Sequence, residues 1–453
     1  MQYQNRNNMF ERRIESELDS WANNPYRKPL VLRGARQVGK TTIVNRFGSK
    51  FENYLSVNLE KLDARRLFES TDNVKELLPL LFLYCNIKRG EGRTLLFIDE
   101  IQNSPHTVSL LRYFHEESPE IYVIAAGSLL ETMLDSHISL PVGRVQYMAL
   151  HPCSFVEFLN AVGEERFLEP IQNANLPDGF HDTLNELFNR YSLIGGMPEA
   201  VALYAAERDF TVLDKVYNSL LNAYKNDVEK YAKNNTQVSV IRYIQEEGWT
   251  FAGETITLGG FGGSPYKARE TGEAFRMLEK AMLLELVYPL TSAIMPMISD
   301  LKKAPKLFWF DAGLVNYAAN IRKEYVVSND LMGTWRGKAA EQIAAQELKA
   351  LSFDVGVKRN FWIRAKQGST AEVDFVYPFD GKIIPIEVKS GHNARLKSIH
   401  QFMDETSHDI AVRIWTGKYG IDEIKTQSHK AFRLINLPFY MISALPDILK
   451  NNS

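Results

Sequence analysis

Residues 31–42 read Val31-Leu32-Arg33-Gly34-Ala35-Arg36-Gln37-Val38-Gly39-Lys40-Thr41-Thr42. They fit the pattern G-x-x-x-x-G-K-[ST] without a gap, after an apolar run at 28–32 and before a helical stripe of Ile43, Val44 and Phe47. A strand, a glycine-bounded loop and a helix start in this order form a concave nest of backbone N–H groups that binds phosphate. A chance match in an ordinary glycine loop would lack these flanking elements. We therefore expect a nucleotide site formed by Gly34, Ala35, Arg36, Gln37, Val38, Gly39, Lys40, Thr41 and Thr42.

Within this loop each polar residue has a separate expected task. Lys40 places a positive charge beside the β- and γ-phosphates of ATP, and the Thr41 hydroxyl is expected to bind Mg²⁺. Residues 94–100, Thr94-Leu95-Leu96-Phe97-Ile98-Asp99-Glu100, predict an apolar strand that ends in two carboxylates, with Asp99 following Gly34 by 65 residues. Parallel sheets place ligands at the C-terminal ends of their strands, so this pair should lie beside the loop. We expect Asp99 to hold Mg²⁺ through water and Glu100 to act as the general base.

Two further residues are candidates for contact with the transferred phosphoryl group. Residues 121–128 predict another buried strand with Ser128 at its tip, where P-loop folds of this type place a residue that senses the γ-phosphate. Arg144, in Pro141-Val142-Gly143-Arg144-Val145, could supply positive charge in cis or from a neighbouring subunit. The alternative for Arg144 is a surface arginine after a turn. Arg12 and Arg13, ahead of the loop, either reach the nucleotide or lie on a solvated helix face.

The order of the motifs carries a family resemblance. The motifs are Gly-Ala-Arg-Gln-Val-Gly-Lys-Thr (34–41), Ile-Asp-Glu-Ile-Gln (98–102), Ala-Gly-Ser (126–128), Gly-Arg-Val (143–145) and His-Pro-Cys-Ser-Phe (151–155). This order resembles the large prokaryotic group of AAA-type P-loop ATPases whose C-terminal region is a domain of unknown function with a restriction-endonuclease-like core. The resemblance covers nearly the whole chain, and it implies the architecture more firmly than the biological role.

The middle of the chain is expected to be helical. Gly195-Gly196-Met197-Pro198-Glu199-Ala200 resembles the family's Gly-Gly-x-Pro-Glu signature at the start of the lid region, read either as a sharp turn into a helix or as a direct part of catalysis. Residues 238–311 resemble a winged helix, with one helix at 238–247, a second that begins at Ser264-Pro265, and wing strands at 281–287 and 306–311. Lys267, Arg269 and Arg276 could meet DNA phosphates there, although winged helices also serve protein contacts.

The C-terminal region contains a third group of charged residues. Residues 371–377 predict a strand that carries Asp374, and residues 382–389 predict a second strand with Glu387 and Lys389 on one face, since strand side chains repeat every second residue. Asp374 precedes Glu387 by 13 residues, the length of a tight hairpin. This is the D…ExK arrangement of restriction-endonuclease-like nucleases, in which Asp374 and Glu387 chelate Mg²⁺ or Mn²⁺ and Lys389 activates a bound water or steadies the phosphate. Glu341, on a predicted helix from residue 337 to 351, matches the acid that often completes such a metal site.

Three readings of this group stay open: a nuclease that cleaves, a nuclease-like core that binds without cleaving, and a charged surface hairpin. Basic and aromatic residues nearby would form a phosphate-binding rim, namely Lys358, Arg359, Arg364, Lys366, Arg395, Lys397, Trp362 and Tyr377. Residues 301–400 carry 16 Lys and Arg against 10 Asp and Glu, in a chain whose formal net charge is −2. DNA is therefore a candidate partner of a local surface rather than of the whole molecule.

Length and composition set the outer limits. The 453 residues predict an α/β protein of three domains: a P-loop AAA-type ATPase at 1–155 with a parallel sheet, a helical lid and winged-helix-like domain at 156–320, and a restriction-endonuclease-like α/β domain at 321–453. The two cysteines, the polar N-terminus and the lack of a long apolar run predict a cytoplasmic protein with no membrane contact. We expect an ATPase coupled to a C-terminal domain that binds or processes nucleic acid. The alternative is a nucleotide-dependent switch that engages protein partners or copies of itself.

Overall fold

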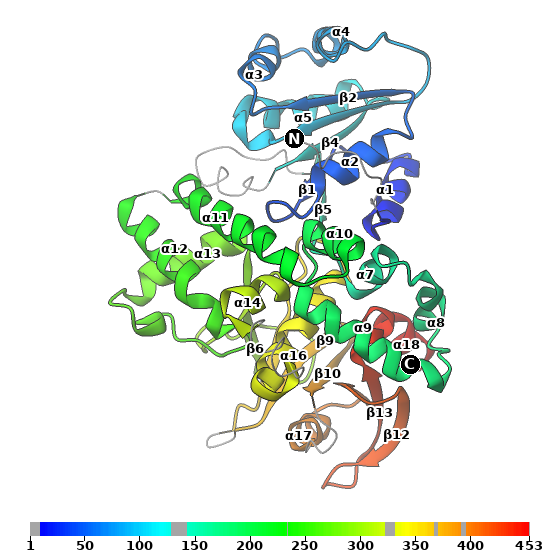
Figure 1. The fold of residues 1–453 in the computed structure, drawn as a ribbon, viewed down its shortest axis with the longest axis vertical. Helices are drawn as coiled ribbons and strands as arrows, with labels where there is room; N and C mark the ends of the chain where they lie inside the picture. The colour runs from blue at the N-terminus through cyan, green and yellow to red at the C-terminus, as the bar shows by residue number, and fades with distance from the viewer. Residues whose placement is uncertain are drawn as a thin grey trace.

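The computed structural model describes residues 10–127, 143–232, 234–321, 331–366, 370–390 and 396–452. An N-terminal α/β part, a helical middle part and a C-terminal sheet follow one another along the long axis of the molecule (Figure 1). One apolar cluster runs from Ile14 to Leu449, so the three parts share a core. None of the described helices combines the length and the apolar composition that a membrane crossing requires.

The N-terminal part is built on a five-stranded sheet in the order β2-β3-β4-β1-β5, and all its pairs are parallel. The strands are β1 (Leu30–Arg33), β2 (Asn53–Asn58), β3 (Thr94–Asp99), β4 (Tyr122–Ala126) and β5 (Gln146–Ala149). Every residue of β1 and β3 is buried, as the continuous apolar runs of the sequence predict for a sheet covered on both faces. The predicted parallel sheet is confirmed.

The helices of this part divide between the two faces of the sheet. Leu30 and Leu32 of β1 pack in one cluster with α1 and α2, whereas Val31 packs in another with α3, α4 and α5. This division follows from the alternation of side chains along a strand. The helices are α1 (Ile14–Asn23), α2 (Lys40–Gly48), α3 (Leu62–Phe68), α4 (Val74–Tyr84) and α5 (Pro105–Glu117).

The middle part consists mainly of helices that lie between the two sheets in Figure 1. They are α7 (Phe155–Ala161), α8 (Leu168–Gln172), α9 (His181–Ile194), α10 (Pro198–Glu207), α11 (Asp214–Tyr231), α12 (Asn235–Glu247), α13 (Ala268–Lys280) and α14 (Ala312–Ala318). Short 3-10 helices in the chain are η1 (Ile101–Asn103), η2 (Glu165–Phe167), η3 (Asp178–Phe180), η4 (Thr211–Leu213), η5 (Gly248–Phe251), η6 (Phe261–Gly263) and η7 (Phe439–Ala444).

One predicted helix start is wrong. The second helix of the winged-helix segment begins at Ala268 rather than at Ser264-Pro265. The Glu270 carboxylate accepts the Lys267 backbone N–H at 2.8 Å, which satisfies a donor at the true N-terminus. The Ser264 hydroxyl is buried and has no hydrogen-bond partner among the described residues. The serine and proline are therefore part of the preceding loop.

The C-terminal sheet has eight strands in the order β12-β13-β11-β10-β9-β8-β6-β7. They are β6 (Leu284–Leu290), β7 (Lys306–Trp309), β8 (Asn360–Ile363), β9 (Glu372–Phe379), β10 (Lys382–Lys389), β11 (Ile410–Trp415), β12 (Gly420–Lys425) and β13 (Ala431–Pro438). Its helices are α16 (Leu331–Ala350), α17 (Lys397–Glu405) and α18 (Leu445–Asn451). The predicted hairpin between β9 and β10 is present, and Asp380 and Gly381 turn it with φ values of 47° and 70°.

The two strands expected as wings of the middle part belong to this C-terminal sheet. β6 and β7 pair antiparallel, as a wing would. On its other side β6 runs parallel to β8, with Tyr288 opposite Asn360 and Leu290 opposite Trp362. The sheet therefore joins strands from both sides of residue 320.

Candidate functional site

The P-loop has the backbone geometry that its two glycines predict. Gly39 has a φ of 96°, a conformation that side chains with a Cβ rarely adopt, directly before α2 begins at Lys40. A Cβ at Gly34 would lie 2.5 Å from the carbonyl oxygen of Leu150. The first glycine is thus required by the close approach of the chain after β5, and the second by the turn itself.

The Lys40 side chain folds back over the loop. Its ammonium group donates hydrogen bonds to the carbonyl oxygens of Gly34 at 2.8 Å and Ala35 at 2.9 Å. Burial lowers the pKa of this ammonium to about 8. An anionic phosphate beside it would oppose that lowering, because a nearby negative charge favours the charged form.

The two carboxylates after β3 lie beside the loop, as predicted. Thr41 Oγ1 donates to Asp99 Oδ2 at 2.8 Å, and the Glu100 carboxylate accepts from the Gln102 amide. Burial raises the pKa of both Asp99 and Glu100. Glu100 also has a left-handed backbone, with φ 54° and ψ 44°.

Lys40, Thr41 and Glu100 border a cavity of about 530 Å³. Four basic residues and two acids contribute charge to its wall, and its lining is Phe10, Arg12, Arg36, Gln37, Gly39, Lys40, Thr41, Thr42, Ile43, Arg46, Glu100, Pro198, Glu199 and Ala202. Arg36 forms an ion pair with Asp227 of α11, so the loop is bonded to the lid helices. Within the loop, the Val38 side chain is fully buried.

Arg12 does not lie on a solvated helix face. It precedes α1, its residue is only 6% exposed, and it donates to Glu157 at 2.9 Å and to the His151 carbonyl oxygen at 2.8 Å. A third contact, 3.4 Å long, reaches the Val38 carbonyl oxygen in the P-loop. The alternative in which Arg12 lies near the nucleotide agrees with this geometry.

The Gly-Gly-Met-Pro-Glu motif has both a structural and a cavity-lining part. A Cβ at Gly196 would collide with the Cys153 carbonyl oxygen, and one at Gly195 with the Gly313 backbone nitrogen. Pro198 is the first residue of α10, as predicted for a turn into a helix, and Pro198 and Glu199 border the cavity. The glycines therefore serve packing, while the last two residues face the candidate site.

The remaining two candidates are not placed with the P-loop. Ser128 lies outside the described residues. Arg144 lies just ahead of β5 and forms an ion pair with Glu116 at 2.8 Å. Since β5 runs parallel to β1, this is the N-terminal edge of the sheet, opposite to the edge that carries the loop. This position agrees with the alternative of a surface arginine after a turn rather than with action in cis, and action from a neighbouring subunit stays a proposal.

The C-terminal candidates do assemble. Asp374 on β9 and Glu387 on β10 are both buried, and the Val388 N–H donates to Asp374 Oδ2 at 2.8 Å. Lys389 contacts Glu387 Oε1 at 2.6 Å. Glu341, on α16, and Asp374 face the same ammonium group, that of Lys306, at 2.8 Å and 3.8 Å. The structure therefore brings these four predicted residues together, and their assignment as a D…ExK site stays a prediction.

Sequence reasoning missed a central member of this group. Lys306, the first residue of β7, has its ammonium group 2.8 Å from Glu341, 2.7 Å from Glu372 and 3.8 Å from Asp374. A signal was available, because Lys306 opens the otherwise apolar run Lys306-Leu307-Phe308-Trp309. A charge at the start of a fully buried strand indicates a buried partner. We call Glu341, Glu372, Asp374, Glu387, Lys306 and Lys389 the acidic cluster.

Three carboxylates of the acidic cluster, those of Glu341, Asp374 and Glu387, have raised pKa values. Burial, followed by the charge of Asp374, raises the pKa of Glu341 to about 7 and that of Glu387 to about 8. Burial also raises the pKa of Asp374. Within the described ranges, no group of three or more His, Cys, Asp or Glu side chains is arranged to hold a metal ion.

Part of the expected phosphate-binding rim is already engaged. Trp362 is fully buried and cannot stack on a base. Arg359 forms an ion pair with Glu285 at 2.9 Å, and Arg364 forms one with Glu405 at 2.7 Å. Arg395 lies outside the described residues. Lys358, Lys366 and Lys397 are exposed.

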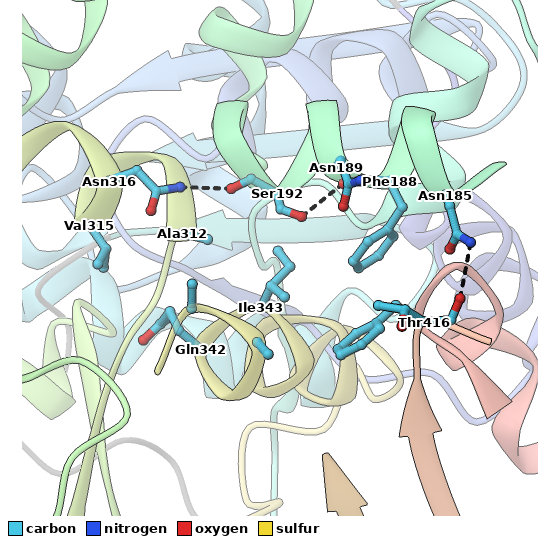
Figure 2. A pocket seen from close by; sticks show the side chains of 13 residues that line it. Asn185, Phe188, Asn189, Ser192, Ala312, Val315, Asn316, Gln342, Ile343 and Thr416 are labelled. Atoms are coloured by element: carbon cyan, nitrogen blue, oxygen red, sulfur yellow. Dashed lines mark hydrogen bonds between the residues drawn. The ribbon is translucent and has the colours of Figure 1, made fainter. Parts of the chain in front are cut away.

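Figure 2 shows a second, much smaller cavity between α9, α14 and α16. Its volume is about 30 Å³, close to the space of one water molecule. The Asn316 amide donates to the Ser192 carbonyl oxygen at 2.8 Å, and the Asn185 amide donates to the Thr416 carbonyl oxygen at 3.1 Å. Polar groups of the lining are thus engaged in joining the elements.

Comparison with known families agrees with the P-loop geometry. Residues 26–159 match the family model of an AAA domain. Residues 185–325 match a domain of unknown function (DUF8612), and residues 336–438 match a second one (DUF4143). The AAA match and the geometry of Lys40, Thr41 and Asp99 together make residues 26–159 an AAA-type P-loop ATPase domain.

The individual proteins that resemble this chain have low sequence identity to it. An uncharacterized protein of Methanocaldococcus jannaschii is 26% identical over 235 residues, which are 48% of this chain and 47% of that protein. The match thus spans about half the length of that relative. A Walker-type ATPase of Pyrococcus abyssi is similar with a TM-score of 0.43 at 14% identity, over 69% of this chain and 96% of that one. A signal transduction ATPase with a tetratricopeptide repeat sensor, from Pyrococcus horikoshii, has a TM-score of 0.28 at 12% identity, over 74% of this chain and 46% of that one.

Proposed function

We propose that the chain binds and hydrolyses ATP with Mg²⁺, and that hydrolysis acts on a C-terminal nuclease-like domain that engages nucleic acid. The observation that carries the ATPase proposal is the arrangement of Lys40, Thr41 and Glu100 around one cavity, with Asp99 hydrogen-bonded to Thr41. The nucleotide would lie with its phosphates at the start of α2, where backbone N–H groups and the helix dipole favour negative charge.

The hydrogen-bonded pair of Thr41 and Asp99 fits a magnesium ion. Thr41 Oγ1 and Asp99 Oδ2 are hard oxygen donors 2.8 Å apart, the ligand type that Mg²⁺ prefers. Thr41 would bind the ion directly, and Asp99 would hold it through water. When bound, the ion neutralises charge on the phosphates.

Other groups of the cavity supply position and proton transfer. Lys40 would leave its two loop carbonyl partners for the phosphates, whose charge is the stronger attraction. Glu100 would orient the attacking water and take its proton. Burial raises the pKa of Glu100, which makes the carboxylate a better base than an exposed glutamate.

Phosphate release from ATP tests this proposal. Lys40→Ala is expected to lower the rate by a factor of about 100 or more, while Asp374→Ala leaves it within about twofold of the wild type. Lys75→Ala, on the exposed side of α4, is the matched control. Loss of hydrolysis in Asp374→Ala would contradict separate sites for ATP and for the acidic cluster.

A second candidate is a nucleotide-dependent switch that engages protein partners or copies of the chain, with a C-terminal domain that does no chemistry. Two observations favour it: Lys306 fills the centre of the acidic cluster, and Trp362 is buried rather than free to stack. A filter-binding titration with duplex and single-stranded DNA at ~50 mM and ~200 mM salt separates the two candidates. Phosphate contacts predict an affinity that falls steeply with salt, whereas the switch predicts no salt-dependent DNA binding.

A further inference from the structure

Lys306 is one of the most enclosed charged groups in the described part of the chain. Its side chain is 4% exposed, and its ammonium group lies among the carboxylates of Glu341, Glu372 and Asp374. The lysine comes from the segment at residues 185–325, whereas the three acids lie within residues 336–438. One part of the chain thus inserts a cation into an acidic site of another.

The backbone of Lys306 is held from both sides. This residue pairs with Val287 of β6, and it forms a bridge with Thr255 on the opposite side. The neighbouring backbone is fixed as well, because the Ile256 N–H donates to the Pro305 carbonyl oxygen at 2.9 Å and the Leu307 N–H to that of Glu254 at 2.9 Å. The ammonium also lies 5.3 Å from the centre of the Phe361 ring. The backbone pairing therefore fixes the point from which the Lys306 side chain extends into the acidic cluster.

A divalent metal does not fit the acidic cluster in this arrangement. The metal ions of D…ExK sites are held by carboxylates such as Asp374 and Glu387, but Asp374 has Lys306 on one oxygen and the Val388 N–H on the other. Lys389 occupies Glu387 Oε1. Glu387 Oε2 is buried and has no hydrogen-bond partner among the described residues. Of the four oxygens of Asp374 and Glu387, only this one is without a partner in the described part of the chain, and a single oxygen beside two ammonium groups is a poor metal site because like charges repel strongly where water is excluded.

We propose that Lys306 is a built-in counter-cation that takes the place of a divalent metal in the acidic cluster. The C-terminal domain then keeps the strands and acids of a nuclease-like site but has no use for a metal ion. The cost of burying several carboxylates is offset by a covalently attached cation instead of a diffusible one. This inference does not depend on ATP hydrolysis or on DNA binding.

The test measures Mn²⁺ binding by electron paramagnetic resonance, with full-length protein free of nucleotide. The wild type is expected to show no Asp374-dependent Mn²⁺ site at millimolar concentrations, so that wild type and Asp374→Asn bind alike. Lys306→Met removes the charge but keeps an apolar stem. This variant is expected to gain one Mn²⁺ site, with an affinity at least about tenfold above any Mn²⁺ binding by the wild type at this cluster. Lys303→Met, an exposed lysine of the same segment, is the matched control and should behave as the wild type.

Two further variants keep the outcome decisive. Lys306→Met/Asp374→Asn should lose the gained site, and Lys306→Gln, which is uncharged but still donates hydrogen bonds, should gain it if Lys306→Met does not fold. A wild-type Mn²⁺ site that Asp374→Asn removes would overturn the proposal. So would a folded Lys306 variant without any gain in affinity. Failure of the ATPase proposal would leave each of these readings unchanged.

Discussion

Glu100 combines two features that residues in ordinary loops seldom share. Its backbone is left-handed, with φ 54°, and its carboxylate is enclosed beside the P-loop cavity. A non-glycine residue in this conformation costs about 1 kcal/mol or more, and such costs concentrate at functional sites. The sharp turn directs the chain from the end of β3 into η1 and leaves the carboxylate on the cavity wall.

The substitution Glu100→Gln is expected to slow ATP hydrolysis by a factor of about 10² to 10⁴ and to leave ATP binding nearly unchanged. Glutamine has a similar size and can still contact a water molecule, but it cannot accept the proton. Single-turnover phosphate release gives the rate, and fluorescent-nucleotide titration gives the affinity. Glu117→Gln, an exposed glutamate at the end of α5, is the control. A variant that hydrolyses ATP at the wild-type rate would remove Glu100 from the mechanism.

The role of a single residue can be predicted when the residues that it contacts are close to it in sequence. Lys40, Thr41 and the two glycines act within one loop, so the sequence pattern alone was enough to predict their arrangement. Lys306 lies 68 residues before Asp374, and no periodic pattern links the two. Arg144 shows the opposite error, since its sequence neighbours suggest a catalytic arginine but the parallel pairing of β5 with β1 places it at the far edge.

The helix α16 is bonded to four other elements through buried polar side chains. Gln342 exchanges two hydrogen bonds with the Trp309 backbone, of 2.6 and 3.1 Å. Gln346 accepts the Ala312 N–H at 2.7 Å and donates to the Tyr191 hydroxyl at 2.9 Å. Glu347 accepts the Phe155 N–H at 3.0 Å and the Tyr191 hydroxyl at 2.6 Å. The helix that carries Glu341 is thereby bonded to β7, α14, α9 and α7.

This network has a pH dependence that Glu347→Gln should reveal. Burial raises the pKa of Glu347 to about 7, from an ordinary value of 4.5. An acid whose folded-state pKa is raised gives its full stability below the unfolded pKa and loses it as the pH rises through the folded pKa. The wild type therefore loses on the order of 3 kcal/mol at this position between about pH 4.5 and pH 7.

Glutamine can still accept both hydrogen bonds but does not ionise. The difference in melting temperature, variant minus wild type, is therefore expected to be larger at pH 8 than at pH 5. Scanning calorimetry at the two pH values measures it, with Glu207→Gln at the exposed end of α10 as the control. An equal difference at both pH values would mean that Glu347 does not lose a proton in this range.

Most elements could be predicted from local signals, and the errors have local causes too. The apolar strand at 94–99 and the hairpin turn Asp380-Gly381 contain their whole signal in a few residues. The start of α13 was predicted too early because Ser264-Pro265 resembles a helix start, while the capping acid Glu270 fits only the later one. Which strand pairs with which is not a local property, so the pairing of β6 with β8 was missed.

For the whole molecule, this pairing decides how independent the C-terminal part is. The predicted boundary between residues 320 and 321 separates β6 and β7 from the six strands that follow. A cut there would leave β8 as an exposed edge and would remove Lys306 from the carboxylates of Glu341, Glu372 and Asp374. Exposed strand edges promote aggregation, and buried carboxylates without their cation oppose folding.

Residues 321–453 produced alone are therefore expected to be insoluble or to melt without a cooperative transition. When this fragment is produced together with residues 1–320, the two fragments are expected to co-purify. The β6–β8 ladder, the Lys306 ion pairs and the contact between the Phe308 and Phe375 rings, whose centres are 5.4 Å apart, can form between two chains as well as within one. Size-exclusion chromatography and thermal melts of the single fragment, the pair and the intact chain measure this.

A Lys306→Met change in the larger fragment should weaken the pair, since it removes the only charge that this fragment contributes to the described acidic cluster. A lone fragment that melts at the temperature of the intact chain would instead show that the C-terminal fold is complete without β6 and β7.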